Sequence, residues 1–230
     1  AEIVVFLADR ADATAFHSPA WCNAVARATG HRFHRLAARN AAGHLVGYLP
    51  LHHVRSMLFG DALVSTGFAV EGGILADDPA TAEALAAAAV ALAGELGVKS
   101  IELRGGHLPN GWQHDSVTNV LFERPLATDR DAELAAIPRK HRAEVRKGLA
   151  NDFAIRTGSD AGGRRDHYAV YAESVRNLGT PVFPRRLFDA VLDAFGDDAD
   201  ILTVADAEGP VSSVLTLYWR GSALPYWGGG

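Results

Sequence analysis

The densest group of side chains able to bind an anion lies between residues 139 and 147. Five of the chain's 22 basic residues fall within these nine positions, and they are Arg139, Lys140, Arg142, Arg146 and Lys147. Glu144 is the one acidic residue among them. A guanidinium group offers several donors in one plane, so this segment suits a phosphorylated donor or acceptor. A basic helix face that only contacts water is the alternative.

A four-residue repeat runs through the same segment. Ile137, His141, Val145 and Leu149 recur at helical spacing, which predicts a helix with one inward-facing stripe. The three arginines would lie on one side of this stripe and the two lysines on another. Such a helix could hold an anion while it stays docked against the protein.

Aromatic and polar side chains gather further along the chain, from Tyr168 to Phe183. Gly179 and Pro181 predict a loop near the end of this stretch, and loops with polar groups beside aromatic rings often bind ligands. We therefore predict that the substrate contacts Tyr171, Asn177, Thr180 and Phe183. Ordinary helix packing is the alternative for this cluster.

Residues 68–73 and 226–230 each bring aromatic side chains up to glycines that permit close backbone approach. Each segment could frame a cleft or form a plain turn, and we include Tyr226 and Trp227 among the predicted substrate contacts. Arg104-Gly105-Gly106 follows a predicted strand but lacks the lysine of a phosphate-binding loop, so a plain turn is expected there.

Metal binding and covalent catalysis have no recognisable motif. The histidine pairs lack cysteine or acidic partners at a zinc spacing, and Cys22 falls inside a predicted helix without a matched base. No residue qualifies as a general base, so the catalytic residues stay unassigned. No metal and no permanently bound cofactor are expected.

Composition narrows the class of protein. The net charge of −5 and the pI near 6.0 argue against a DNA-binding protein, because phosphate binding needs a cationic surface. A single cysteine fits a reducing compartment, and no apolar run reaches the roughly 18 residues of a membrane span. A cytoplasmic protein without a membrane span is expected.

The elements that must position these residues come from a duplication. Thr14 to Leu58 matches Thr180 to Leu224 without gaps, at an offset of 166 residues and with twelve identities in 45 positions. The identical pairs are Thr14/Thr180, Ala24/Ala190, Val25/Val191, Ala28/Ala194, Gly30/Gly196, Leu36/Leu202, Ala41/Ala207, Gly43/Gly209, Leu49/Leu215, Leu51/Leu217, Ser56/Ser222 and Leu58/Leu224.

Each copy predicts a helix followed by a hairpin. Ser18 and Pro19 begin the first helix and Gly30 ends it, while residues 184–195 repeat the pattern before Gly196. Strands are expected at 32–38 and 44–51 and again at 200–205 and 211–218. Further elements are a helix at 80–96 capped by Asp78, a strand at 100–103, one or two helices at 131–150 broken at Pro138, a strand at 153–156 and a helix at 165–177. Residues 2–9 fit a helix by the offset and a strand by propensity.

Two strings resemble the FemAB family, and more narrowly its branch associated with PEP-CTERM/exosortase systems. They are Ile137-Pro138-Arg139-Lys140-His141-Arg142-Ala143-Glu144-Val145-Arg146-Lys147-Gly148 and Tyr171-Ala172-Glu173-Ser174-Val175-Arg176-Asn177-Leu178-Gly179-Thr180-Pro181-Val182-Phe183. The likeness extends over Phe16 to Gly230. It implies an α/β fold of tandem GNAT-like acyltransferase domains, with mixed sheets flanked by helices.

The resemblance and the duplication together predict three parts. Residues 1–126 would form the first GNAT-like domain, 127–151 a basic helical linker, and 152–230 a second domain that is truncated at its C-terminus. The pyrophosphate loop usual in GNAT proteins is absent from residues 1–230, and we expect it in the missing end of the second copy unless it has been lost.

The resemblance implies an acyl or aminoacyl transferase that forms an amide bond on an amine acceptor in cell-envelope, peptidoglycan or exopolysaccharide synthesis. The donor would be acyl-CoA or aminoacyl-tRNA, with tRNA as the carrier in the second case. The acceptor would be a phosphorylated envelope precursor or a small amine. The alternatives are a non-catalytic anion-binding scaffold and an acyl-CoA-dependent N-acyltransferase of small molecules.

Overall fold

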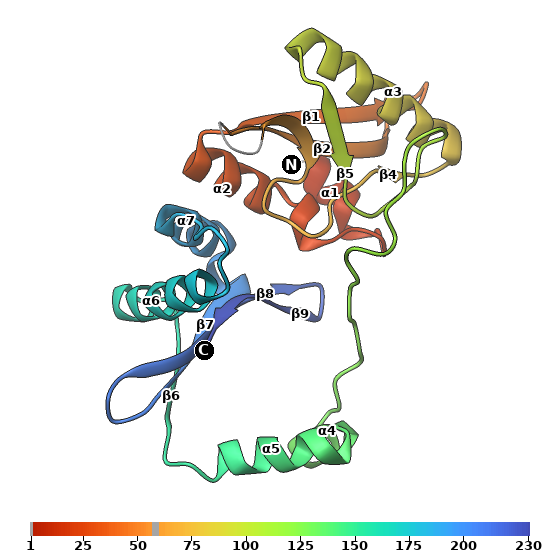
Figure 1. Ribbon diagram of the computed structural model, residues 1–230. Helices are drawn as coiled ribbons and strands as arrows, with labels where there is room; N and C mark the ends of the chain where they lie inside the picture. The colour runs from red at the N-terminus through yellow and green to blue at the C-terminus, as the bar shows by residue number, and fades with distance from the viewer. Residues whose placement is uncertain (1, 57–59) are drawn as a thin grey trace.

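The computed structural model describes residues 2–56 and 60–230. It contains two α/β units, each a mixed or antiparallel sheet flanked by helices, and a helical arm that connects them (Figure 1). The expected arrangement of two α/β units, with sheets flanked by helices, is confirmed.

The first unit is built on a five-stranded sheet of order β1-β2-β3-β5, with β4 also paired to β2. All its strand pairs are antiparallel except β3 and β5, which are parallel. Its elements are α1 (Glu2–Ala8), η1 (Ala15–His17), α2 (Pro19–Thr29), β1 (Arg32–Arg39), β2 (Leu45–Ser56), β3 (Gly60–Ser65), β4 (Leu75–Ala76), α3 (Pro79–Leu96) and β5 (Ser100–Leu103).

The second unit has a four-stranded antiparallel sheet of order β6-β7-β8-β9. Its elements are β6 (Ala154–Thr157), α6 (Ala161–Asn177), α7 (Arg185–Phe195), η2 (Gly196–Asp198), β7 (Ala199–Ala205), β8 (Pro210–Trp219) and β9 (Ser222–Gly229). α2 and α7 occupy the same positions at the offset of 166 residues, so the predicted duplication of the helix is confirmed. Residues 2–9, which fitted both helix and strand, contain the helix α1 and correspond to part of α6.

The caps that bound these helices follow their local chemistry. The Ser18 hydroxyl accepts from the Trp21 N–H at 3.1 Å, and the Asp78 carboxylate accepts from the Thr81 N–H at 2.8 Å. Gly30 ends α2 in the left-handed region at φ 78°. Both predicted caps and the predicted helix end are confirmed.

The strand pairing shows that the two copies do not match without a gap. Leu36 pairs with Leu49, but its counterpart Leu202 pairs with Val214 and not with Leu215. The second hairpin turn is one residue shorter, and a slip of one residue moves a side chain to the other face of a sheet. Leu49 and Leu51 therefore pack with α3, whereas Leu215 and Leu217 pack with α2 and α7.

Beyond the turn, the identical residues of the two copies therefore do not occupy equivalent positions in the two sheets. The ungapped match is wrong there. Leu58, which the match aligns with Leu224, lies outside the described residues.

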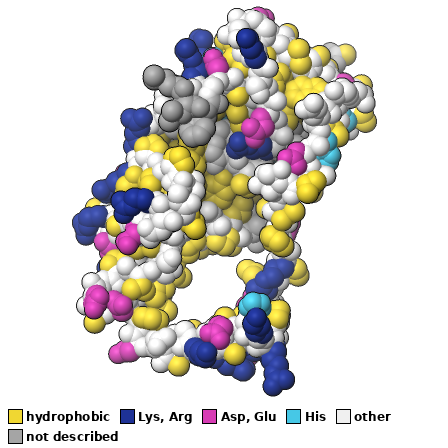
Figure 2. Space-filling view, viewed as in Figure 1, with side chains coloured by type: hydrophobic (Ala, Val, Ile, Leu, Met, Phe, Trp, Pro, Cys, Tyr) yellow, Lys and Arg dark blue, Asp and Glu magenta, His cyan; other side chains and the backbone are white. Residues whose placement is uncertain are grey.

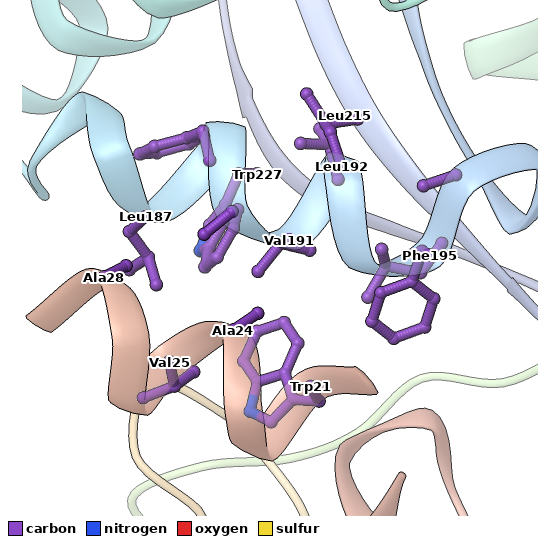
Figure 3. Packing of buried hydrophobic residues seen from close by; sticks show 14 of the residues in the cluster. Trp21, Ala24, Val25, Ala28, Leu187, Val191, Leu192, Phe195, Leu215 and Trp227 are labelled. Atoms are coloured by element: carbon purple, nitrogen blue, oxygen red, sulfur yellow. The ribbon is translucent and has the colours of Figure 1, made fainter. Parts of the chain in front are cut away.

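One hydrophobic core joins the two units. α2 and α7 lie against each other, and Ala24 and Ala28 of α2 face Leu187 and Val191 of α7 (Figure 3). Trp227 of β9 lies 5.6 Å from Trp21, measured between ring centroids. Because the same cluster contains residues of η1, α2 and the loop after β3 in the first unit, and of the helices and sheet of the second, the two units form a continuous packed body.

The arm consists of α4 (Arg130–Ala136) and α5 (Arg139–Leu149), separated at Pro138 as predicted. The predicted docking of α5 is wrong, since none of its residues is buried and Val145 and Leu149 are exposed. The predicted helix is present, but its apolar stripe does not pack against a hydrophobic core.

Among the described helices, α3 alone has the length and apolarity of a membrane span, with 18 residues and a mean hydropathy of 1.2. Leu85, Ala89 and neighbouring alanines pack one side of α3 on the first sheet. Glu83 and Glu95 lie within it. We interpret α3 as a helix of the first unit, and the cytoplasmic location remains a prediction.

Candidate functional site

A pocket of about 420 Å³ lies where the two parallel strands of the first sheet end. β3 and β5 run in the same direction and end at Ser65 and Leu103, so their carboxyl ends meet at one edge. The N-terminus of α3 and residues 71–78 complete the wall, together with Asp12, Thr14, His17, Arg104, Gly106 and His107. Crevices at the carboxyl ends of parallel strands are common ligand sites.

Two glycine-rich segments, 72–73 and 105–106, form one wall of this pocket, where their backbones lie in direct contact. The Gly73 N–H donates to the Arg104 carbonyl at 2.9 Å, and Ile74 pairs with Gly106 as a parallel bridge. A Cβ on Gly73 would lie 1.9 Å from the Gly105 carbonyl oxygen. Gly105 and Gly106 both have positive φ, at 70° and 74°. The turn predicted at Arg104 to Gly106 is therefore also a pocket wall.

Arg104 fixes the loop that leaves β3. Its guanidinium donates to the carbonyl groups of Thr66 and Ala69, and to the Glu102 carboxylate at 2.6 Å. The Arg104 N–H donates to the Ser65 hydroxyl at 3.1 Å. One side chain thus ties the ends of both parallel strands together.

Four carboxylates line the pocket, and three of them already have partners. Asp12 and Asp77 each form an ion pair with Arg10, at 2.8 and 2.5 Å. Asp78 caps α3. Among the described residues, Glu71 has no hydrogen bond or ion pair, and burial, with a smaller effect from Glu123, raises the pKa of Glu71. Glu71 is therefore the pocket group best suited to accept a proton.

His17 is a structural member of the pocket wall. Its Nδ1 accepts from the Thr14 N–H at 3.1 Å, which places the proton on Nε2, and Nε2 donates to the Gly73 carbonyl at 3.0 Å. Burial lowers the pKa of His17 to about 4. The neutral ring holds Gly73 in place and has no nitrogen left for a substrate.

The predicted aromatic contacts gather in one cluster, at the contact between the two units. Tyr171, Phe183, Tyr226 and Trp227 lie within ring-contact distance of one another or of Phe188. Tyr171 and Trp227 are buried, and the Tyr226 hydroxyl donates to the Phe68 carbonyl at 2.7 Å. This last bond links β9 to the loop that Arg104 holds.

The polar and basic residues predicted for the site lie elsewhere. Asn177 and Thr180 are exposed at the end of α6, and α5 carries Arg139, Lys140, Arg142, Arg146 and Lys147 on the arm. Arg142 donates to the carbonyl groups of Ala135 and Ile137, and Lys147 pairs with Glu144 at 3.1 Å. The structure does not bring these seven residues into the 420 Å³ pocket.

The residues that the sequence interpretation missed are Glu71, Arg104 and their neighbours in the loops. A signal was present, because Glu71 directly precedes the glycine pair at 72–73 and Arg104 precedes the pair at 105–106. Two glycine pairs after two strands indicate close backbone approach, but only the parallel pairing of β3 and β5 shows that the two pairs meet.

Comparison with known proteins agrees with this architecture. Residues 138–230 match the family described as an acetyltransferase (GNAT) domain. A solved structure titled "Crystal structure of FemX" has a similar fold, with a TM-score of 0.68 at 12% identity, and the alignment covers 100% of this chain and 78% of that chain. No curated protein matches. Residues 138–230 are therefore similar to GNAT-type acetyltransferase domains, and the chain has a tandem α/β fold similar to that of FemX.

Proposed function

We infer that this protein is an N-acyltransferase or aminoacyltransferase that joins an acyl group to an amine acceptor in cell-envelope or exopolysaccharide synthesis. The observation that carries the reaction class is the pocket at the carboxyl ends of β3 and β5, which contains Glu71, a carboxylate without a partner among the described residues. The GNAT match and the FemX-like fold support a transferase. The FemAB resemblance supports the envelope role and the narrower exosortase-associated branch.

Glu71 gives this reaction the proton acceptor that the sequence did not provide. An amine arrives as an ammonium ion, and Glu71 would take its proton and free the nitrogen lone pair. The nitrogen then attacks the acyl carbonyl carbon, the C–N bond forms, and the C–S or C–O bond to the carrier breaks. The nitrogen loses its second proton as the amide forms, and the leaving thiolate or alkoxide takes this proton up. Because the amine attacks the acyl group directly, no covalent enzyme intermediate is needed.

The net charge of the pocket favours an amine over an acidic acceptor. Arg10 offsets part of the charge of Asp12 and Asp77, and the Arg104 guanidinium is engaged by neighbouring carbonyl groups and by Glu102, so the four pocket carboxylates still outnumber these two cations. A cationic ammonium is attracted into such a site, whereas an anionic group would be repelled. The phosphorylated part of an envelope precursor would therefore lie outside the pocket.

The contacts predicted from the sequence remain part of the proposal. Basic residues of α5 would contact a phosphate group, and Asn177 and Thr180 would contribute polar contacts at the mouth between α6 and α7. Among the lysines and arginines of α5, Arg139, Lys140 and Arg146 have no hydrogen-bond or ion-pair partner among the described residues. They are therefore the first candidates for the phosphate contact. Tyr171, Phe183, Tyr226 and Trp227 would act from the packed cluster behind the substrate.

A donor screen tests the proposed function. The purified protein is incubated with a panel of amines and with either acyl-CoA or aminoacyl-tRNA, and release of free CoA or deacylated tRNA is measured together with amide formation. Acyl-CoA is the donor that GNAT domains use, so we expect thiol release that depends on the amine. Donor binding without turnover for every amine would favour the non-catalytic scaffold.

A further inference from the structure

α5 exposes both its charged and its apolar side chains. None of its residues is buried, and the exposed fractions of Val145 and Leu149 are 37% and 52%. Open space separates the arm from the second sheet, and Lys and Arg side chains gather on the arm (Figure 2). An amphipathic helix whose apolar stripe faces solvent has a surface that something else must cover.

The charge of α5 opposes that of the rest of the protein. The helix carries five basic residues against Glu144, a net charge of +4, whereas the whole chain carries −5. The remainder therefore carries −9, by subtraction of +4 from −5. An anionic surface would attract α5 and repel the body, so it would bind the molecule in one orientation.

The order of side chains around α5 is that of a helix lying in a membrane interface. Val145 and Leu149 lie on one stripe, the arginines lie beside it along one edge, and the two lysines lie on the opposite, polar face of the helix. Long basic side chains can then reach lipid phosphates while the stripe enters the acyl boundary. Arg139, Lys140 and Arg146 have no protein partner among the described residues and are free to do so.

The segment that leads into the arm adds apolar groups. Val120, Leu121 and Phe122 are consecutive and exposed, and Phe122 is 90% exposed. Aliphatic and aromatic side chains gain free energy when they leave water for lipid. A nucleic acid would bind the cations but has no apolar interior for Val145, Leu149 or Leu121, which favours a bilayer as the partner.

We propose that α5, together with residues 120–122, docks this protein on an anionic lipid bilayer, with the basic residues on headgroup phosphates and the apolar residues in the interface. The proposal goes beyond the transferase activity and does not depend on it. It assigns to the basic helix a lipid surface as the source of the phosphate.

Co-sedimentation with lipid vesicles tests the proposal. The full chain is mixed with vesicles of phosphatidylglycerol and phosphatidylcholine, and with vesicles of phosphatidylcholine alone. We expect binding to the first kind only, weakened by salt. The triple variant R139E/K140E/R146E should lower the partition coefficient by about tenfold or more, because each cation contributes near the surface. V145S/L149S should weaken binding at unchanged charge.

The matched control is K99E/R186E, which reverses two exposed cations on the body of the protein and should leave vesicle binding unchanged. Equal binding of wild type and triple variant, or no binding to anionic vesicles, overturns the proposal. Competition by millimolar inorganic phosphate, or tighter binding to tRNA that V145S/L149S does not affect, also overturns it, in favour of a small-anion or RNA site. The vesicles contain no acyl donor, so the result is independent of the transferase assay.

Discussion

Glu71 is the pocket carboxylate that has no hydrogen bond or ion pair among the described residues, and burial raises its pKa. The Glu71→Gln variant keeps the shape of the side chain but cannot accept a proton, so kcat/KM for amide formation should fall by about 10² to 10⁴-fold at neutral pH. Glu95→Gln, on the exposed side of α3, is the matched control and should retain activity.

The pH profile separates a base from a residue that merely shapes the pocket. Burial raises the pKa of Glu71, so the active carboxylate form is lost at a higher pH than for an ordinary glutamate. The wild-type rate should rise with pH through that raised pKa, and Glu71→Gln should remove this limb. A limb that persists in the variant would assign the base to another group.

His167 shows how burial couples stability to pH. Its Nδ1 lies 3.0 Å from the Ser213 hydroxyl, and burial lowers the pKa of His167 from 6.5 to about 4. Between these values the unfolded chain takes up a proton that the folded protein does not, so the free energy of unfolding falls as the pH drops, by about 1.4 kcal/mol per pH unit for each such histidine. His17 and His52 behave alike.

The variant His167→Phe should make the unfolding free energy less sensitive to pH. The phenyl ring fits beside Tyr171 and Phe188, whose ring centroids lie 6.4 and 5.7 Å from that of His167. Urea unfolding at pH 5.5 and 4.5 should show a slope smaller by about 1.4 kcal/mol per pH unit than in the wild type. An unchanged slope would mean that His167 is protonated in the folded state.

At the scale of the elements, the contact between the glycine segments 72–73 and 105–106 leaves no room for a side chain at Gly73. A methyl group on Gly73 would collide with the Gly105 carbonyl at 1.9 Å, so Gly73→Ala must push the two loops apart. We expect a loss of about 1–3 kcal/mol in the free energy of unfolding. Gly94→Ala is the control, because nothing lies within 4 Å of its Cβ inside α3, and it should stabilise by about 0.5–1 kcal/mol.

Helices and hairpins were predictable because their signals are local. The Ser18 and Asp78 caps, Gly30 and Pro138 each act within one turn of the chain, and all four do what the sequence predicts. The pocket was not predictable, because Glu71 and Arg104 meet only through pairing of distant strands. The same limit applies to α5. Its sequence periodicity predicts the helix, but it does not predict whether another part of the protein covers the apolar stripe of Val145 and Leu149.

At the scale of the whole molecule, the core between α2 and α7 makes the two units depend on each other. Leu187 of α7 is fully buried in the cluster that also contains Trp21, Val25 and Ala28 of α2. Leu187→Ala should therefore cost about 2–5 kcal/mol, whereas Leu178→Ala, at an exposed position, should change stability by at most about 0.5 kcal/mol.

The shared core also predicts that this loss reaches the first unit. If the units unfold together, hydrogen exchange of the β2 amides, far from Leu187 in the sequence, should accelerate in Leu187→Ala by the same free energy as exchange in β8. Tryptophan fluorescence and circular dichroism should follow one transition. Protection of β2 that stays at the wild-type level would show two independent cores, and the bond between Tyr226 and Phe68 would then join units that fold separately.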